Sequence, residues 1–175
     1  MRSLYAAAAA TLLAACAAPS FLLPAKDLEF ELAGRIGIKY RDEAASGNIA
    51  WRHSARDDEL LLTSPLGQGL ARIVRDGGEV TLTTQDGHEF RAADAESLTE
   101  QALGFRLPLA GLADWVRARA APGPAVTRKD PEGRLAEIEQ FGWKVEYLEY
   151  VGKLPSRLNL TYPGVQLRLA ISGWK

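Results

Sequence analysis

The 175-residue sequence has one cysteine, Cys16, and two histidines, His53 and His88. A single thiol forms no internal disulfide, so the fold does without one. The same counts exclude a cysteine-cluster or histidine-rich zinc site. The formal net charge of −1 lacks the basic excess that favours nucleic-acid binding. We therefore expect no metal site and no nucleic-acid partner.

The signatures of common enzymes are also missing. Gly67-Gln68-Gly69 lacks the third glycine of a dinucleotide fingerprint, and there is no phosphate-binding Walker loop or Gly-x-Ser-x-Gly elbow. Glu137 and Glu139 share one face of a predicted strand, and paired carboxylates can serve acid–base catalysis. A solvated strand face explains them better, and surface positions explain His53 and His88. The sequence predicts a protein that is not an enzyme and uses no cofactor.

The N-terminal segment differs in composition from the rest of the chain. Arg2 is the only charged residue before Lys26, and a short apolar run ends at Leu13-Ala14-Ala15-Cys16. A positive start, a short apolar region and small residues at its end are typical of a secretory signal. The last four residues resemble a bacterial lipobox, which implies cleavage before Cys16 and acylation of that cysteine. The alternative is a secreted protein with a chance cysteine.

This segment sets the expected organisation of the chain. We predict a lipoprotein signal peptide at 1–15, an acylated cysteine and tether at 16–27, and a single lipid-binding domain at 28–175. Two or more acyl chains hold a protein firmly on its membrane, whereas one chain does not. In lipoproteins generally, aspartate after the cysteine retains the protein in the inner membrane. Ala17 stands there instead, so we expect a lipid anchor on the periplasmic side of the outer membrane.

Alternation of apolar and polar residues predicts strands along most of the mature chain. The clearest runs from Leu28 to Tyr40, and further alternating stretches continue to Ile171. Turn-forming pairs such as Asp76-Gly77 and Asp86-Gly87 separate them. The pattern indicates an antiparallel meander of about ten strands.

Two helices are predicted in the middle of the chain. The period changes at Asp94, which is a plausible helix cap, as is Ser97. Pro108 suits the first turn of the second helix. Its apolar stripe consists of Leu109, Leu112, Ala113 and Val116. The helices either close one end of the sheet in the ordinary way or cap an apolar space, as in lipid-binding barrels.

A turn at Ser64 to Gly69 carries an unusual residue at its tip. Leu66 lies between Pro65, which presets a turn, and Gly67, which supplies special dihedral angles. Turn tips are usually polar. From the residues alone, Leu66 either folds back onto the core or is exposed to enter a membrane or an apolar partner site.

Several segments together resemble the LolB family of outer-membrane lipoprotein receptors. They occur in the family's order and cover nearly all of the mature chain. These segments are Gly34-Arg35-Ile36-Gly37, Gly47-Asn48-Ile49-Ala50-Trp51, Ser64-Pro65-Leu66-Gly67, Leu107-Pro108-Leu109 with Trp115, Gly142-Trp143-Lys144-Val145 with Tyr147 and Tyr150, Leu154-Pro155, and Leu167-Arg168-Leu169.

The resemblance implies a mainly β fold, an incomplete, half-open barrel of about eleven antiparallel strands. It encloses a hydrophobic cavity under a helical lid. It implies a monomeric receptor that takes mature lipoproteins from the periplasmic chaperone LolA and places them in the outer membrane. The family's protruding-loop leucine, which is linked to cargo insertion, falls on Leu66, and its acylated cysteine falls on Cys16.

We expect the concave face of the sheet and the lid to shield the acyl chains of the cargo. The candidates are Phe30, Leu32, Ile36, Ile38, Ile49, Trp51, Leu112, Val116, Trp143, Val145, Tyr147, Leu158, Leu160, Leu167 and Leu169. With no ATP site, transfer must run downhill in affinity from chaperone to receptor to bilayer.

Two other functions remain open at this stage. One is a lipocalin-like envelope carrier of small hydrophobic ligands, which would not need Leu66 to be exposed. The other is a structural or hydrolytic envelope lipoprotein, which would need a cluster of polar groups in a cleft, for instance around His53 or around Glu137 and Glu139.

Overall fold

The computed structural model describes residues 21–24, 27–104 and 106–175, in which eleven strands and two helices follow one another. In chain order these are β1 (Phe30–Tyr40), β2 (Glu43–His53), β3 (Asp58–Thr63), β4 (Gly69–Asp76), β5 (Glu79–Thr84), β6 (Glu89–Ala92), α1 (Ala95–Leu103), α2 (Leu109–Trp115), β7 (Val126–Lys129), β8 (Leu135–Gln140), β9 (Trp143–Val151), β10 (Leu154–Tyr162) and β11 (Val165–Trp174).

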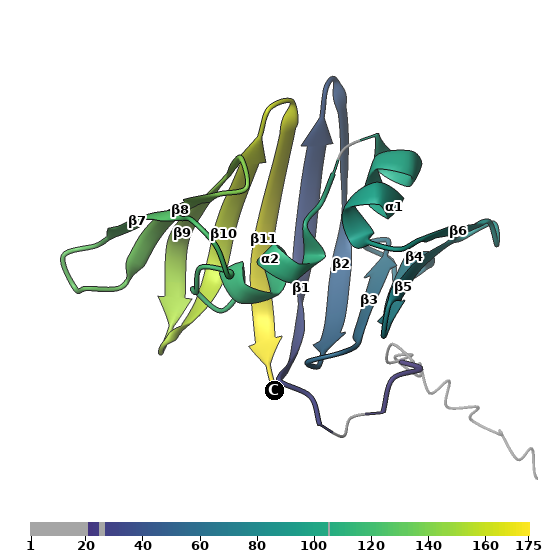
Figure 1. Cartoon of the computed structure of the whole chain (residues 1–175), viewed down its shortest axis with the longest axis horizontal. Coiled ribbons are helices and arrows are strands. Elements are labelled where there is room, and N and C mark those ends of the chain that lie inside the picture. Colours follow the sequence, from purple (N-terminus) through teal and green to yellow (C-terminus); the bar gives the residue numbers. More distant parts are fainter. Residues whose placement is uncertain (1–20, 25–26, 105) are drawn as a thin grey trace, which may run out of the picture.

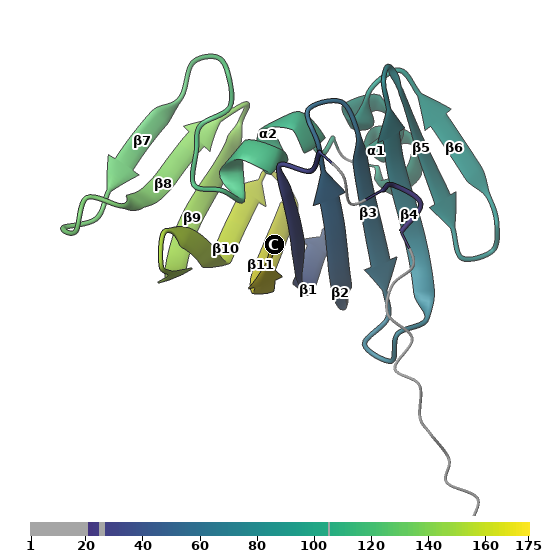
Figure 2. The same ribbon diagram turned by 90° about the horizontal axis from the view of Figure 1, so that it is seen from below.

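All eleven strands form one sheet in the order β6-β5-β4-β3-β2-β1-β11-β10-β9-β8-β7. Every neighbouring pair is antiparallel, and the first and last strands of the domain, β1 and β11, pair in the middle. The sheet curls around the two helices but β6 and β7 remain as its separate edges (Figures 1 and 2). The expectation of an incomplete antiparallel barrel with a helical lid is confirmed.

The strand register gathers the apolar residues on the face that curls toward the helices. Leu32 of β1 pairs with Trp51 of β2, Trp51 with Leu60 of β3, and Leu60 with Ile73 of β4. Directly paired residues lie on the same face of a sheet. All four side chains are buried. We call this the inner face of the sheet, and the opposite side its outer face.

The two helices have different terminal structures. Asp94 caps α1, because its side chain accepts a hydrogen bond from the Ser97 N–H at 2.7 Å, and Gly104 ends the helix with a φ of 79°. Of the two caps considered, Asp94 is therefore the right one. Helix α2 begins after Pro108 and stops at Trp115, so the last residue of the predicted stripe, Val116, lies at its C-cap. No helix in residues 21–24, 27–104 and 106–175 has the length and apolar character to cross a membrane.

Strand β7 was not predicted from the sequence. The four residues of β7, Val126–Lys129, are all exposed, and they pair only with β8 along the edge of the sheet. A short, fully exposed edge strand has no buried side and so leaves no alternation to detect. The count of about ten strands is therefore one short, while the eleven implied by the family resemblance is right.

Candidate lipid-binding core and protruding loop

The inner face and the lid share one cluster of apolar side chains. All fifteen acyl-cavity candidates from the sequence belong to it or pack against it; Ile36 and Ile38 are partly buried and the others are buried. The sequence candidates omitted other buried members of the cluster from the helices and from strands β3 and β4. Among these are Leu60, Ile73, Leu98, Leu109 and Trp115. Leu109 lies in the recognised helical stripe, so a signal for it was present.

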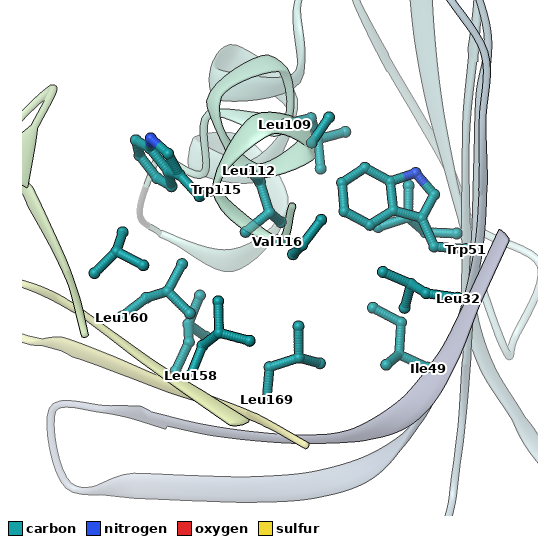
Figure 3. Close-up of a cluster of buried hydrophobic side chains, with 14 of the residues drawn as sticks. Leu32, Ile49, Trp51, Leu109, Leu112, Trp115, Val116, Leu158, Leu160 and Leu169 are labelled. Carbon is teal, nitrogen blue, oxygen red and sulfur yellow. The ribbon is translucent and has the colours of Figure 1, made fainter. Parts of the chain in front are cut away.

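The lid is closed over the inner face. Leu112 of α2 and Val116 at its C-cap project into the space between Trp51 and the leucines Leu158 and Leu169 of the sheet (Figure 3). Val116 has no exposed surface. A hollow of about 1040 Å³ instead lies mainly on the outer face of β2–β5. The candidate residues therefore meet one another in this closed form, and a bound chain needs the lid to move.

Polar contacts hold the lid at the β8–β9 side. The Tyr147 hydroxyl donates to the Trp115 carbonyl at 2.8 Å, and the Trp115 indole N–H donates to Oε1 of buried Gln140 at 2.9 Å. Gln140 also donates to the carbonyl of Ala121 and accepts from its N–H, at 2.8 and 2.9 Å. Burial raises the pKa of the Tyr147 phenol well above its ordinary value, so the phenol stays a hydrogen-bond donor.

A second set of contacts holds the lid at the start of β1. Arg117, just beyond α2, donates to Glu29 at 2.6 Å and to the carbonyl of Ala113 at 2.9 Å. Its guanidinium lies 3.4 Å from Asp114. The hydrogen bond from Arg117 lowers the pKa of Glu29, so this carboxylate is ionised at neutral pH. Helix α2 is thus fixed to the sheet by polar groups at both of these sides and between them by apolar packing.

A buried polar network lies beside this contact. The carboxylate of Asp58 accepts hydrogen bonds from the Trp51 indole at 2.8 Å and from Arg75 at 2.6 Å, and lies 2.6 Å from Nδ1 of His53. His53 is buried and its Nε2 lies 3.9 Å from Glu29. The expected surface position of His53 is therefore wrong. Phe30 stacks on its ring and Asp58 lies directly opposite it in the sheet, which the position of His53 at a strand end did not indicate.

The network gives a prediction about stability and pH. Burial raises the pKa of Asp58, but hydrogen bonds and charge from His53, Arg75 and Trp51 outweigh this and leave its pKa below the usual value. The ionised group therefore contributes stability above the unfolded-state pKa of about 3.9, and this is lost as the pH falls through the lower folded-state pKa. We expect Asp58→Asn to cost about 2 kcal/mol at pH 7.

Urea unfolding between pH 7 and pH 3 measures this effect. The cost of Asp58→Asn should shrink as the pH falls below about 4, because the unfolded wild type then takes up a proton on Asp58 and the folded protein follows at lower pH. A cost that stays constant over the whole pH range would contradict the assignment. Asp42→Asn is the matched control, since Asp42 is exposed in the β1–β2 turn.

The polar residues considered as catalytic candidates occupy two different settings. Glu137 pairs with Arg128 and Lys144 on the sheet surface, and Glu139 and His88 are exposed, as expected. His53, in contrast, borders a cleft of about 500 Å³ between the sheet and the lid. The polar contacts of His53 in the described part of the chain are with the carboxylates of Asp58 on β3 and Glu29 just before β1. Glu29 in turn accepts a hydrogen bond from Arg117 beside the lid. This arrangement serves to hold the structure together.

Leu66 stands at the tip of a well-defined loop between β3 and β4. The Ser64 N–H donates to the Gln68 carbonyl at 2.7 Å, the Gly67 N–H donates to Ser64 at 2.9 Å, and Asn48 donates to the Ser64 carbonyl at 3.0 Å. Gly67 has a φ of 87°, which suits glycine. Leu66 is 91% exposed. The possibility that it folds back onto the core is therefore wrong. Pro65 and Gly67 are exposed beside it.

The loop points away from the helices, from the outer side of the curved sheet (Figure 2). The molecule therefore presents an apolar residue to solvent on one side and encloses its apolar interior on the other. Cys16, the predicted lipid anchor, lies outside the described residues, as do the signal peptide and the first part of the tether.

A half-open antiparallel barrel with an apolar inner face and a helical lid is the class of fold to which this domain belongs. The crystal structure of a DUF1329 family protein from Desulfovibrio piger shares this fold, with 8% identity, a TM-score of 0.50 and coverage of 83% of this chain and 84% of that one.

Sequence comparison identifies the particular family. The family model for the outer membrane lipoprotein LolB matches residues 28–174. The outer-membrane lipoprotein LolB of Thiobacillus denitrificans is 43% identical over 146 residues, covering 82% of this chain and 78% of that protein. The LolB protein of an Azoarcus species is 36% identical over 179 residues, covering 97% and 93%. The chain belongs to the LolB family, the outer-membrane lipoprotein receptors of the lipoprotein-localisation pathway.

Proposed function

We propose that this protein accepts mature lipoproteins from a periplasmic chaperone of the LolA type and places them in the outer membrane. It holds the acyl chains of the cargo between the inner face of the sheet and the lid, and it acts as a monomer by binding and transfer, without covalent chemistry. The observation that carries the proposal is the continuous apolar cluster that joins the lid to the inner face. Family membership supports the same role.

The closed lid gives the transfer a physical mechanism. Leu112 and Val116 occupy the inner face when the lid is shut, so an acyl chain enters only by displacing them. Each buried methylene of the chain contributes about 0.8 kcal/mol. A bound chain therefore replaces the apolar contacts of the lid with its own. The protein needs no energy source, because the cargo moves toward whichever partner holds it more tightly.

The anchor and the loop place this exchange at the membrane. Acylated Cys16 keeps the protein on the periplasmic side of the outer membrane. Leu66, exposed with Pro65 and Gly67 at the loop tip, contacts the lipid surface while cargo is released. The bilayer is the final and tightest acceptor of the acyl chains, so release into it completes the downhill sequence.

Transfer of a labelled lipoprotein from its LolA complex to this protein, and then to liposomes, tests the proposal. We expect the purified protein to take up the cargo without ATP and to pass it to liposomes. Mass spectrometry of the full-length protein should show a cleaved, acylated Cys16. The Cys16→Ser form should be soluble and should still accept cargo, because the binding residues lie in the folded domain.

Three results would contradict parts of this proposal. Failure of both forms to take cargo from the chaperone complex would exclude the receptor function. Binding of free fatty acids without uptake of lipoprotein would favour a carrier of small hydrophobic ligands. An uncleaved, unmodified Cys16 would exclude the anchor alone.

Because the lid must open before an acyl chain can bind, removing a contact that keeps it closed should raise the affinity for the chain. Tyr147→Phe deletes the hydrogen bond to the Trp115 carbonyl while keeping the aromatic ring in place. One hydrogen bond is worth about 1 kcal/mol, so the open form should become about fivefold more populated. The apparent affinity for a fluorescent fatty acid should rise by the same factor.

Tyr150→Phe is the matched control. The Tyr150 hydroxyl donates to the carbonyl of Leu135 at 2.6 Å, which joins two strands and leaves the lid untouched. Its removal should lower stability by a similar amount without changing ligand affinity. Equal affinities in both variants and the wild type would show that lid opening does not limit binding.

A further inference from the structure

The segment that leads from the anchor to the domain is bound to the outer face of the sheet. The backbone N–H of Leu22 donates to Oε2 of Glu59 at 2.7 Å, and that of Leu23 donates to the same oxygen at 2.7 Å. Arg52 donates to the Leu23 carbonyl at 2.8 Å, and its guanidinium lies 4.1 Å from the centre of the Phe21 ring. We call residues 21–24 the strap.

Glu59, the residue that the strap contacts, is buried in the outer face of the sheet. Glu59 pairs with Arg52 across β3 and β2, one residue along from Leu60 and Trp51, so both side chains lie on the outer face. Glu59 has no exposed surface. A buried carboxylate is costly unless hydrogen bonds and charge compensate it. The two strap N–H groups and Arg72, 3.5 Å away, supply that compensation.

The strap shortens the distance that the anchor can reach. Five residue steps separate Cys16 from Phe21, and a chain of that length spans at most about 18 Å. Were the chain free as far as Phe30, where β1 begins, fourteen steps would allow about 50 Å. The longer reach would let the domain turn in any direction, whereas the shorter one keeps the outer face near the membrane.

The outer face beside the strap suits a lipid surface. The hollow of about 1040 Å³ is bordered by Leu22 of the strap and, at the foot of the β3–β4 loop, by Gly67 and Leu70. Leu22 is 71% exposed and Leu70 is 39% exposed. Leu66 lies at the tip of the adjoining loop, so these three leucines form an exposed apolar group on the outer side of the sheet.

We propose that the outer face of β2–β5 rests on the phospholipid surface and that the docking of the strap on Glu59 fixes this orientation. The Leu66 loop then points at the bilayer throughout the cycle, and the lid side faces the periplasm, from which cargo arrives. This inference rests on the proposed function in one respect, the acyl anchor at Cys16.

The orientation is tested with the lipidated, full-length protein on phosphatidylethanolamine–phosphatidylglycerol vesicles that contain a headgroup-linked quencher. One dye is attached at Thr81→Cys, on the outer face in the wall of the hollow, and another at Arg106→Cys, between the two helices. The first dye should be quenched strongly and the second weakly. Glu59→Ala should remove this difference. Glu149→Gln, which breaks a surface ion pair with Arg157 elsewhere in the sheet, should preserve it.

Docking of the strap is measured separately on the soluble Cys16→Ser form. Glu59→Ala should accelerate hydrogen exchange at the Leu22 and Leu23 amides about tenfold or more, the effect of losing a bond to a charged acceptor. Leu22→Pro deletes one donor without changing the sheet, so it should release the strap even where Glu59→Ala impairs folding.

The outcomes separate the two proposals. Failure of the full-length protein to bind vesicles would overturn the anchor and the orientation together. Vesicle binding with equal quenching of both dyes, or with a difference that survives release of the strap, would overturn the orientation alone. Unprotected Leu22 and Leu23 amides in the parent protein would overturn the docking of the strap.

Discussion

Replacing Leu66 with glutamate should leave folding and cargo acceptance near normal while slowing delivery to the membrane about ten- to a hundredfold. Burial of a leucine side chain contributes about 1.5–3 kcal/mol, which corresponds to that range. Leu66 is 91% exposed, so the substitution removes no packing from the folded protein. A charged tip, in contrast, resists entry into lipid. Cargo-bound receptor should accumulate in a reconstituted assay from chaperone to liposomes.

Leu148→Glu is the matched control for this substitution. Leu148 is another exposed leucine, 52% accessible, on β9 rather than in the β3–β4 loop. It should deliver cargo at the wild-type rate. Equal rates for Leu66→Glu and the wild type would contradict the insertion role, and so would equal slowing by both variants. The lowered stability expected of a core substitution should be absent from the thermal unfolding of Leu66→Glu.

The parts of the fold that the sequence predicted are those in which one side of an element is buried. The alternation from Leu28 to Tyr40 corresponds to β1, which begins at Phe30. The Gly77 and Gly87 turns have positive φ angles of 61° and 82°, as hairpins require. Strand β7 has no buried side, and the alternation of residues gave no sign of it.

The site was less predictable because it depends on contacts between distant residues. The inner-face candidates were found from their alternation, but their closure under Leu112 and Val116 is a property of the packed lid. Trp115 adjoins the predicted stripe yet is fully buried, held by Gln140 from β8. Glu59 has the sequence setting of an ordinary strand carboxylate, and only the folded chain shows that the strap covers it. No local pattern in a sequence encodes such pairings.

The apolar inner face of the sheet is buried under the lid, whereas the apolar tip of the β3–β4 loop, Leu66, is exposed. This difference suits a transfer function. The inner face is covered by the lid and becomes available only on opening, which protects it from nonspecific association. Leu66 is exposed on the folded domain while the lid is closed, but a single leucine is too small to cause aggregation or to hold a protein on a membrane by itself. The first surface is suited to holding a chain, and the second to guiding its release.

Val116→Asp should reduce the affinity for an acyl chain about a hundredfold at pH 7 while leaving the sheet folded. Val116 has no exposed surface and belongs to the cluster that joins the lid to the sheet. An unpaired buried carboxylate costs several kcal/mol, so the lid would shift outward or the group would take up a proton. With the lid shifted outward, the ionised group still borders the space that an acyl chain fills, and it opposes the removal of water from that space.

Titration of a fluorescent fatty acid measures this loss, with circular dichroism as the check on the sheet. Val116→Ala is the matched control, because it removes apolar atoms without adding charge, and it should bind nearly as well as the wild type. Burial raises the pKa of a carboxyl group, so the Val116→Asp variant should regain affinity as the pH falls and the introduced group is neutralised. Wild-type affinity of a folded Val116→Asp variant at pH 7 would show that the lid stripe packs locally and does not border the acyl chain.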